Sequence, residues 1–103
     1  MKRTIILTIA LSLLLAPAVF ADDAAALFKT KCQTCHGANG AADTPMAKKF
    51  AVKGLGSADV QKQTDAQLTT TITKGRNKMP AFDGKLTADQ VKALVALIRS
   101  FKK

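Results

Sequence analysis

The sequence predicts one small all-α domain of three to four helices wrapped around a large apolar cofactor. Two capping boxes, Thr64 to Gln67 and Thr87 to Gln90, open segments whose apolar residues recur at helical spacing. The chain has 103 residues, no Trp or Tyr and only five Phe. That is little aromatic bulk for the core of so short a domain. A flat cofactor would supply the missing apolar volume.

The first 21 residues are typical of a secretory signal peptide. Lys2 and Arg3 precede an uncharged apolar run over residues 5–15, and residues 17–21 add a proline and small residues. A retained membrane anchor is the less favoured interpretation, because a spanning helix needs roughly 20 apolar residues. We expect cleavage after Ala21, a periplasmic location without stable membrane insertion, and a folded domain over residues 22–103.

The mature chain would be strongly basic. Removing Lys2 and Arg3 with the leader leaves 82 residues with 14 Lys and Arg against 7 Asp and Glu, a net charge of +7. Export argues against nucleic acid as the partner of this charge, so we expect a monomer that docks with acidic proteins. Part of the lysine content is explained by solvation alone.

The first half of the mature chain predicts one helix followed by a long loop. Asp22 or Asp23 can cap a helix that carries Leu27 and Phe28 and runs into Cys32. Residues 37–56 are rich in glycine and have no sustained period, so we expect a loop with a short turn at 46–52. A loop of this length in a compact domain is usually functional, for example in wrapping a ligand.

The second half predicts a brief turn and two helices. Ser57 can cap the turn, and the capping box at Thr64 opens a helix that Gly75 ends, although residues 69–71 would also fit a strand. The box at Thr87 opens a terminal helix. Its apolar residues repeat every three or four positions, at Val91, Leu94, Val95, Ile98 and Phe101.

The segment Cys32-Gln33-Thr34-Cys35-His36 carries the chemistry. Two thiols at this spacing can add across the two vinyl groups of a haem, and the adjacent imidazole can bind its iron. A zinc site would need a fourth ligand, and a thioredoxin-like centre should follow a strand. A disulfide closing so small a loop would stabilise little. We therefore predict one haem c, covalently attached through Cys32 and Cys35, with His36 as an iron ligand.

The opposite face of the iron needs a second ligand if the protein only passes electrons, and the chain has no second His. Met46 and Met79 are the candidates. Met79 lies 43 residues after His36 in an irregular stretch before Pro80, which leaves enough chain to pass around a haem. Met46 follows His36 by only 10 residues, so we favour Met79.

At these residues the sequence resembles the class I c-type cytochromes, particularly the short bacterial monohaem ones. The resemblance covers the mature chain and rests on Phe28, the Cys32 to His36 motif, the segment 78–82 and the terminal helix. It implies that the first and last helices cross near one haem edge, with His36 and Met79 as axial ligands. Ala24 and Leu97 depart from the glycine and aromatic residue that the family often has, so a looser or differently tilted crossing is expected.

The function that follows is an exported electron carrier, not an enzyme, whose haem iron cycles between ferric and ferrous states. Two alternatives remain: a haem enzyme or ligand-binding domain with an open sixth site, and an electron-transfer subunit of a larger oxidoreductase. A carbonyl near Pro45 could accept the other N–H of the His36 imidazole. Arg76, Asn77 and Lys78 could hold the haem propionates or simply be solvated.

The leader and the paired thiols predict how the protein matures. Protein purified from the periplasm should begin at Asp22 and carry one haem that acidified organic solvent does not extract. Intact-mass spectrometry measures both properties. A mass equal to the full precursor, or haem lost into the solvent, would contradict this maturation.

Overall fold

The computed structural model describes residues 21–103, and over this range the chain forms six helices and no β-strand beyond isolated bridges. They are α1 (Ala21–Lys31), α2 (Gln33–His36), α3 (Pro45–Lys49), α4 (Ala58–Gln61), α5 (Asp65–Lys74) and α6 (Ala88–Ser100). The predicted all-helical fold is confirmed. There are more helices than expected because α2, α3 and α4 have only four or five residues each, too few for a periodic apolar pattern. The predicted signal peptide lies outside the described residues, apart from Ala21.

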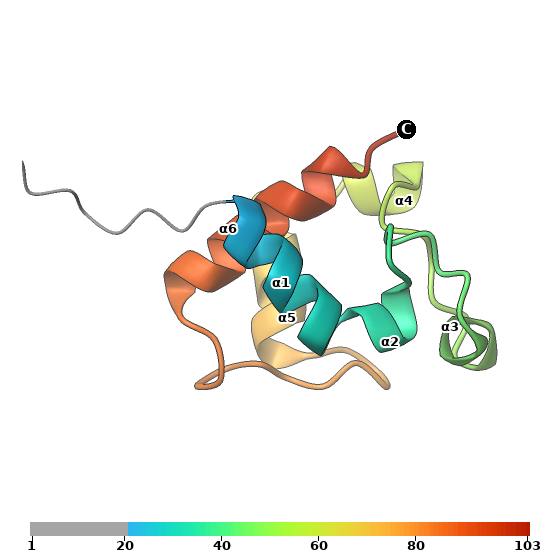
Figure 1. Cartoon of the computed structure of the whole chain (residues 1–103), viewed down its shortest axis with the longest axis horizontal. Helices are drawn as coiled ribbons and strands as arrows, with labels where there is room; N and C mark the ends of the chain where they lie inside the picture. Colours follow the sequence, from blue (N-terminus) through green and yellow to red (C-terminus); the bar gives the residue numbers. More distant parts are fainter. Residues whose placement is uncertain (1–20) are drawn as a thin grey trace, which may run out of the picture.

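The three longer helices, α1, α5 and α6, enclose the core. Helix α6 contacts both α1 and α5, whereas α2 contacts α1 and α3. Figure 1 shows α6 crossing α1, with α3 on the far side of the domain and α4 beside the C-terminal end of the chain. The buried side chains of the core cluster come from α1, α4, α5, α6 and the loops before α4 and after α5. They are Phe28, Leu55, Val60, Leu68, Ile72, Phe82, Val91, Leu94, Val95 and Ile98.

Local side-chain hydrogen bonds begin the last three helices where the sequence predicts them. The Thr64 hydroxyl accepts from the Gln67 backbone N–H at 3.1 Å, and the Thr64 N–H donates to the Gln67 side chain at 2.8 Å. Thr87 and Gln90 form the same capping box with the same two distances. Ser57 caps α4 by accepting from the Val60 N–H at 3.4 Å. These caps satisfy N–H groups that have no partner within the helix.

The threonine run in α5 is helical, so the strand alternative for residues 69–71 is wrong. The hydroxyls of Thr70, Thr71 and Thr73 donate to the carbonyls four residues earlier, at 2.9, 3.1 and 2.9 Å. Leu68 and Ile72, spaced by four residues, are both buried on the core side of α5. Burial of this stripe outweighs the weak helix propensity of threonine.

The long loop after the first helix contains the expected turn, shifted slightly toward the N-terminus. Helix α3 spans Pro45–Lys49, with Thr44 as its cap and proline in its first turn. The Thr44 hydroxyl accepts from the Ala47 N–H at 3.0 Å. Proline is well suited to this position because it lacks an N–H and has a helical φ angle. Ala47 is 1% exposed, and α3 contacts α2.

The two departures from the family pattern do not prevent the end helices from packing. Ala24 is 1% exposed on α1, and α1 contacts α6 directly. Leu97 is half-buried and packs against the core cluster. A small methyl group at the first position and an aliphatic side chain at the second therefore still allow a close crossing.

The last residues of the chain hold the loop in place. Phe101 packs its ring on Phe28, with the ring centroids 5.4 Å apart. The loop is tied to itself by a 2.7 Å hydrogen bond from the Leu55 N–H to the Gly40 carbonyl. A Cβ atom at Gly40 would lie 3.0 Å from both Leu55 and the Phe101 ring, and one at Gly56 would overlap the Phe101 carbonyl oxygen.

This close approach predicts different outcomes for two neighbouring glycines. Gly56→Ala should lower the free energy of unfolding by about 1–3 kcal/mol, because the added methyl overpacks a backbone contact. Gly54→Ala is the matched control, since the nearest atom to its Cβ would be 3.7 Å away. Guanidinium denaturation followed by circular dichroism compares the two proteins. Equal stability of the two variants would show that residue 56 does not press on the C-terminus.

Candidate functional site: the Cys32 to His36 turn and a cleft beside the Met79 loop

The motif from Cys32 to His36 forms a single helical turn at the end of α1. The Cys32 N–H donates to the Phe28 carbonyl at 2.9 Å, and the N–H groups of Cys35 and His36 both donate to the Cys32 carbonyl, at 3.2 and 3.0 Å. Residues three and four apart on a helix lie on the same face. Cys32, Cys35 and His36 therefore share one face, and all three are half-buried.

The loop that follows completes the hydrogen bonding at the end of this turn. The Thr44 hydroxyl donates to the Cys35 carbonyl at 2.8 Å, and the Ala42 N–H donates to the His36 carbonyl at 2.8 Å. Gly37 ends the helix with a φ of +84°, and a Cβ there would overlap the Asp43 carboxylate. The C-terminal carbonyls of so short a helix would otherwise lack partners. The loop therefore holds the motif in one conformation.

The His36 ring is poised to bind a further group. Its centroid lies 6.4 Å from that of Phe28, and burial lowers the pKa of His36 below its usual value. The ring is therefore neutral at neutral pH and can act as a ligand. Its Nδ1 atom is buried without a hydrogen-bond partner among the described residues, whereas Nε2 is not enclosed in this way. The hydrogen bond to a carbonyl near Pro45, which the sequence allows, is therefore not formed by Nδ1 within this part of the chain.

Both cysteines are free thiols, and burial raises the pKa of Cys32 to about 11, with a smaller contribution from the nearby Cys35. The Cys32 side chain thus carries its proton at neutral pH. Only the thiolate attacks disulfides and metals readily, so this environment protects Cys32 from such reactions. Addition of a thiol across a vinyl group keeps that hydrogen in the product. Two thiols and an imidazole whose Nε2 atom is not enclosed, all on one face, fit a covalently attached haem.

Met79 lies in a closed loop pinned to the end of α5. Arg76 and Met79 exchange backbone hydrogen bonds of 3.2 and 2.9 Å, and Asn77 between them has a φ of +54°. The N–H groups of Phe82 and Asp83 then donate to the Ile72 and Thr73 carbonyls at 3.1 and 3.0 Å. The loop is therefore fixed on both sides of Met79.

The same loop has two further constraints. The Lys74 ammonium bonds the Asp83 carboxylate at 2.9 Å and thereby lowers the pKa of Asp83. A Cβ at Gly75, whose φ is +74°, would lie 2.6 Å from the Met79 carbonyl oxygen. Met79 is half-buried and packs against the same core cluster as Cys32, whereas Met46 is half-buried on α3 and is not among the side chains that do so.

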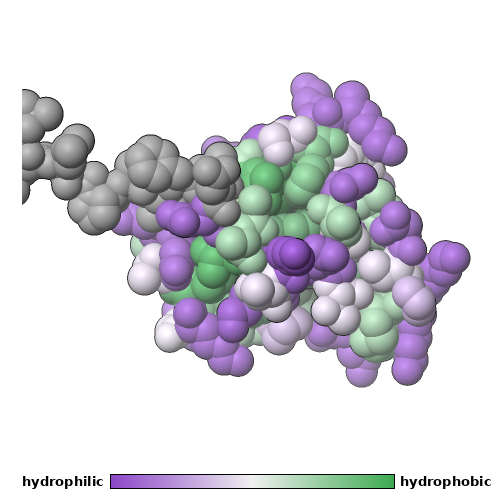
Figure 2. All heavy atoms as spheres, viewed as in Figure 1, coloured by the Kyte–Doolittle hydropathy of each residue, from purple (hydrophilic) through white to green (hydrophobic). Residues whose placement is uncertain are grey.

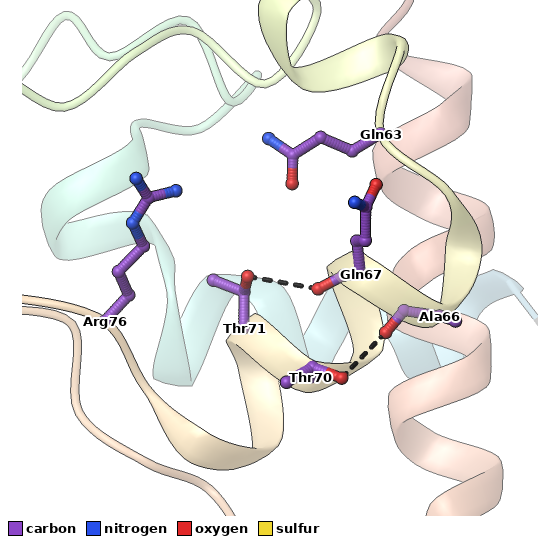
Figure 3. Close-up of a pocket in the computed structure, with 6 residues that line it drawn as sticks. All are labelled: Gln63, Ala66, Gln67, Thr70, Thr71 and Arg76. Atoms are coloured by element: carbon purple, nitrogen blue, oxygen red, sulfur yellow. Dashed lines mark hydrogen bonds between the residues drawn. The ribbon is translucent and has the colours of Figure 1, made fainter.

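A cleft of about 460 Å³ opens beside this loop. It is lined by Gln63, Ala66, Gln67, Thr70, Thr71 and Arg76. Figure 3 shows Gln63 and Arg76 on opposite sides of the opening, with Gln67 and Thr71 between them on α5. None of the predicted cofactor residues lines this cleft. Arg76 connects it to the Met79 loop, because only two residues separate them.

The comparisons with known proteins agree with this arrangement. The family model described as cytochrome c oxidase, cbb3-type, subunit III matches residues 20–98. The chain belongs to the class I c-type cytochromes. Cytochrome c6 of Microcystis aeruginosa is 32% identical over 74 residues, which are 70% of this chain and 85% of that protein. Cytochrome c6 of Synechococcus sp. is 32% identical over 108 residues, covering 93% and 90%.

The similarity to a solved structure supports the same family. The KustC0563 c-type cytochrome is 34% identical and superimposes with a TM-score of 0.72, covering 78% of this chain and 98% of that one. Membership of the class I c-type cytochromes implies a covalently attached c-type haem, and Cys32 and Cys35 supply the two thiols. Among residues 21–103, no helix has both the length and the apolar character that a membrane span requires.

Two features near the site are not evident from the sequence. The polar side of the cleft at Gln63, Gln67 and Thr71 was not anticipated, although the capping box had already placed Gln67 in the first turn of a helix. The second feature is a hydrogen-bond network around Arg99. Its partners lie 34 to 38 residues away, so no local pattern in the sequence indicates it.

Proposed function

We propose that the mature chain is an exported electron carrier whose haem is attached through Cys32 and Cys35 and ligated by His36 and Met79. The observation that carries the proposal is the Met79 loop, closed by reciprocal backbone hydrogen bonds and pinned to α5. A ligand on so constrained a loop keeps its position when the charge of the iron changes. Constant coordination keeps the reorganisation small, and this favours rapid electron transfer.

The haem supplies the one-electron redox chemistry, and the residues around it set its reduction potential. The neutral thioether of Met79 favours ferrous iron, as does a buried environment that disfavours the additional charge of the ferric state. His36 is held by the turn from which the thioethers also extend, so attachment and ligation share one rigid element. Of the three polar residues before Met79, Arg76 lines the cleft. This position supports its pairing with a haem propionate over simple solvation.

The basic surface supports docking with acidic redox proteins. The ion pairs of the described residues engage Lys53, Lys62, Lys74 and Arg99. The other ten Lys and Arg side chains of residues 23–103 are exposed and make no ion pair among those residues. Figure 2 shows hydrophilic side chains around much of the edge of one face, with apolar and some hydrophilic side chains between them. A largely hydrophilic edge around a partly apolar centre suits a short-lived complex.

A second candidate function rests on the matched family description, which names an oxidase subunit. On this alternative the chain still transfers electrons but stays bound to a larger complex. Fractionation distinguishes the two. The carrier is released with the periplasmic contents as a monomer, whereas a subunit remains with the membranes until detergent extracts its complex.

The Met79 assignment predicts a specific loss of sulfur ligation. Met79→Ala should retain covalent haem, since attachment needs only the cysteines, while the vacant iron position admits water or carbon monoxide and the reduction potential falls. Truncation of the partly buried side chain should lower the free energy of unfolding by about 2 kcal/mol before the lost iron bond is counted. The measurement is the weak long-wavelength absorption band of ferric haem that reports sulfur bound to iron.

Met46→Ala is the matched control and should keep this band. If the band instead survives Met79→Ala and disappears in Met46→Ala, the ligand assignment is wrong. If the unmutated protein lacks the band and binds carbon monoxide readily, the carrier proposal gives way to the open-site alternative.

The charge of the mature protein predicts how electron transfer depends on salt. With a net charge of +7, the bimolecular rate with an acidic redox partner should fall as ionic strength rises. Screening at a Debye length of about 10 Å in 0.1 M salt weakens attraction between exposed charges. Stopped-flow kinetics over a salt series measures this dependence. A rate that stays constant or rises would reject docking through the basic surface.

A further inference from the structure

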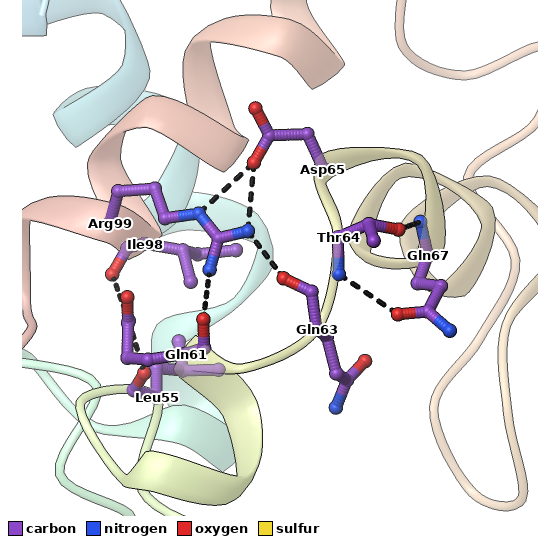
Figure 4. A network of polar contacts seen from close by, with 8 residues as sticks. All are labelled: Leu55, Gln61, Gln63, Thr64, Asp65, Gln67, Ile98 and Arg99. Carbon is purple, nitrogen blue, oxygen red and sulfur yellow. Dashed lines mark hydrogen bonds and ion pairs between the residues drawn. The ribbon is translucent and has the colours of Figure 1, made fainter.

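Arg99, near the end of α6, binds the chain segment that joins α4 to α5. Its guanidinium donates to the backbone carbonyls of Gln61 at 2.8 Å and Gln63 at 2.5 Å. It also donates to one carboxylate oxygen of Asp65 from Nε at 3.0 Å and from Nη2 at 2.8 Å. Figure 4 shows the guanidinium facing this segment, with all its partners on the α4 and α5 side.

The neighbouring Gln61 strengthens the same junction. Its side-chain amide donates to the carbonyls of Leu55 and Ile98, both at 2.8 Å. Gln61 therefore donates to the backbone of α6 while its own carbonyl accepts from Arg99. The Arg99 side chain is 31% exposed, against 75% for Asp65. Two charge-assisted bonds to carbonyls at a partly buried position outweigh the exposed ion pair, because surface ion pairs contribute little.

This junction determines where one side of the cleft lies. Gln63, whose carbonyl Arg99 binds, lines the cleft with its side chain, and Gln67 lies two residues after Asp65 in the first turn of α5. Helix α6 also contacts α1, which leads into Cys32. Helix α6 thus contacts both the helix that leads into the Cys32 to His36 turn and the start of α5 that lines the cleft.

We propose that Arg99 is a positioning residue that holds the cleft-lining segment from Gln63 to Gln67 across the cleft from Arg76 of the Met79 loop, and thereby limits the access of water to a haem that Met79 ligates. This inference rests on the proposed function. Loss of the two carbonyl bonds would let the segment move outward. Greater exposure of a haem to water favours the ferric state, so the reduction potential of the protein would fall.

The test compares the midpoint potentials of purified holoproteins. Arg99→Lys keeps the charge but cannot reproduce the planar fork that reaches several acceptors, so its potential should be lower than that of the unmutated protein. Asp65→Asn leaves both carbonyl bonds in place and should change the potential much less. Val95→Ala truncates a buried α6 residue outside this network and controls for a general loss of stability, which denaturation measures for each variant.

Two outcomes overturn the proposal. One is a potential of Arg99→Lys equal to that of the unmutated protein or of a comparably destabilised Val95→Ala. The other is an equal shift in Asp65→Asn, which would assign the effect to the ion pair and not to the carbonyl bonds.

A further variant keeps the proposal testable if Arg99→Lys does not fold. Gln63→Ala removes a cleft-lining side chain but leaves the carbonyl that Arg99 binds, so the protein should remain stable and its potential should fall. An unchanged potential would show that this segment does not influence the haem. Failure of the proposed function is recognised separately, because it appears in the unmutated protein as a missing sulfur-ligation band.

Discussion

The turn from Cys32 to His36 is the constraint on which the rest of this structure depends. Two thiols and an imidazole have to project from one face of the backbone. A helical turn achieves this because residues three and four positions apart lie on the same face. A turn of four residues does not persist alone, because nucleating a helix costs more than one turn returns. Helix α1 directly precedes it and is joined to it by the Cys32 N–H to Phe28 carbonyl hydrogen bond, and the Thr44 and Ala42 hydrogen bonds complete its C-terminal end.

Sequence patterns predicted the structure correctly where the interacting residues lie within four positions of each other. The capping boxes at Thr64 and Thr87 predicted the starts of α5 and α6, and the terminal apolar repeat predicted the buried face of α6. The composition and spacing of the Cys32 to His36 motif predicted a covalent haem, and family membership confirmed it. The strand alternative for the threonine run was wrong because burial of Leu68 and Ile72 decides the conformation there.

The remaining features depend on residues that are distant in the sequence. Arg99 finds its carbonyl partners in a segment 36 to 38 residues earlier, and no periodic pattern connects the two. Helix α2 is too short to show a period. The roles of Met79 and of the leader remain predictions. What the structure adds is that the Met79 loop is fixed by backbone groups and glycine geometry, and these can be seen only in three dimensions.

The contacts of Phe101 join the loop to both end helices. Phe101 directly follows α6, its ring packs on Phe28 of α1, and it lies close to Gly40 and Gly56 of the loop. Fraying of the last turn of α6 would therefore loosen the loop and the packing of α1 together. We expect these three segments to open as one unit in the native protein.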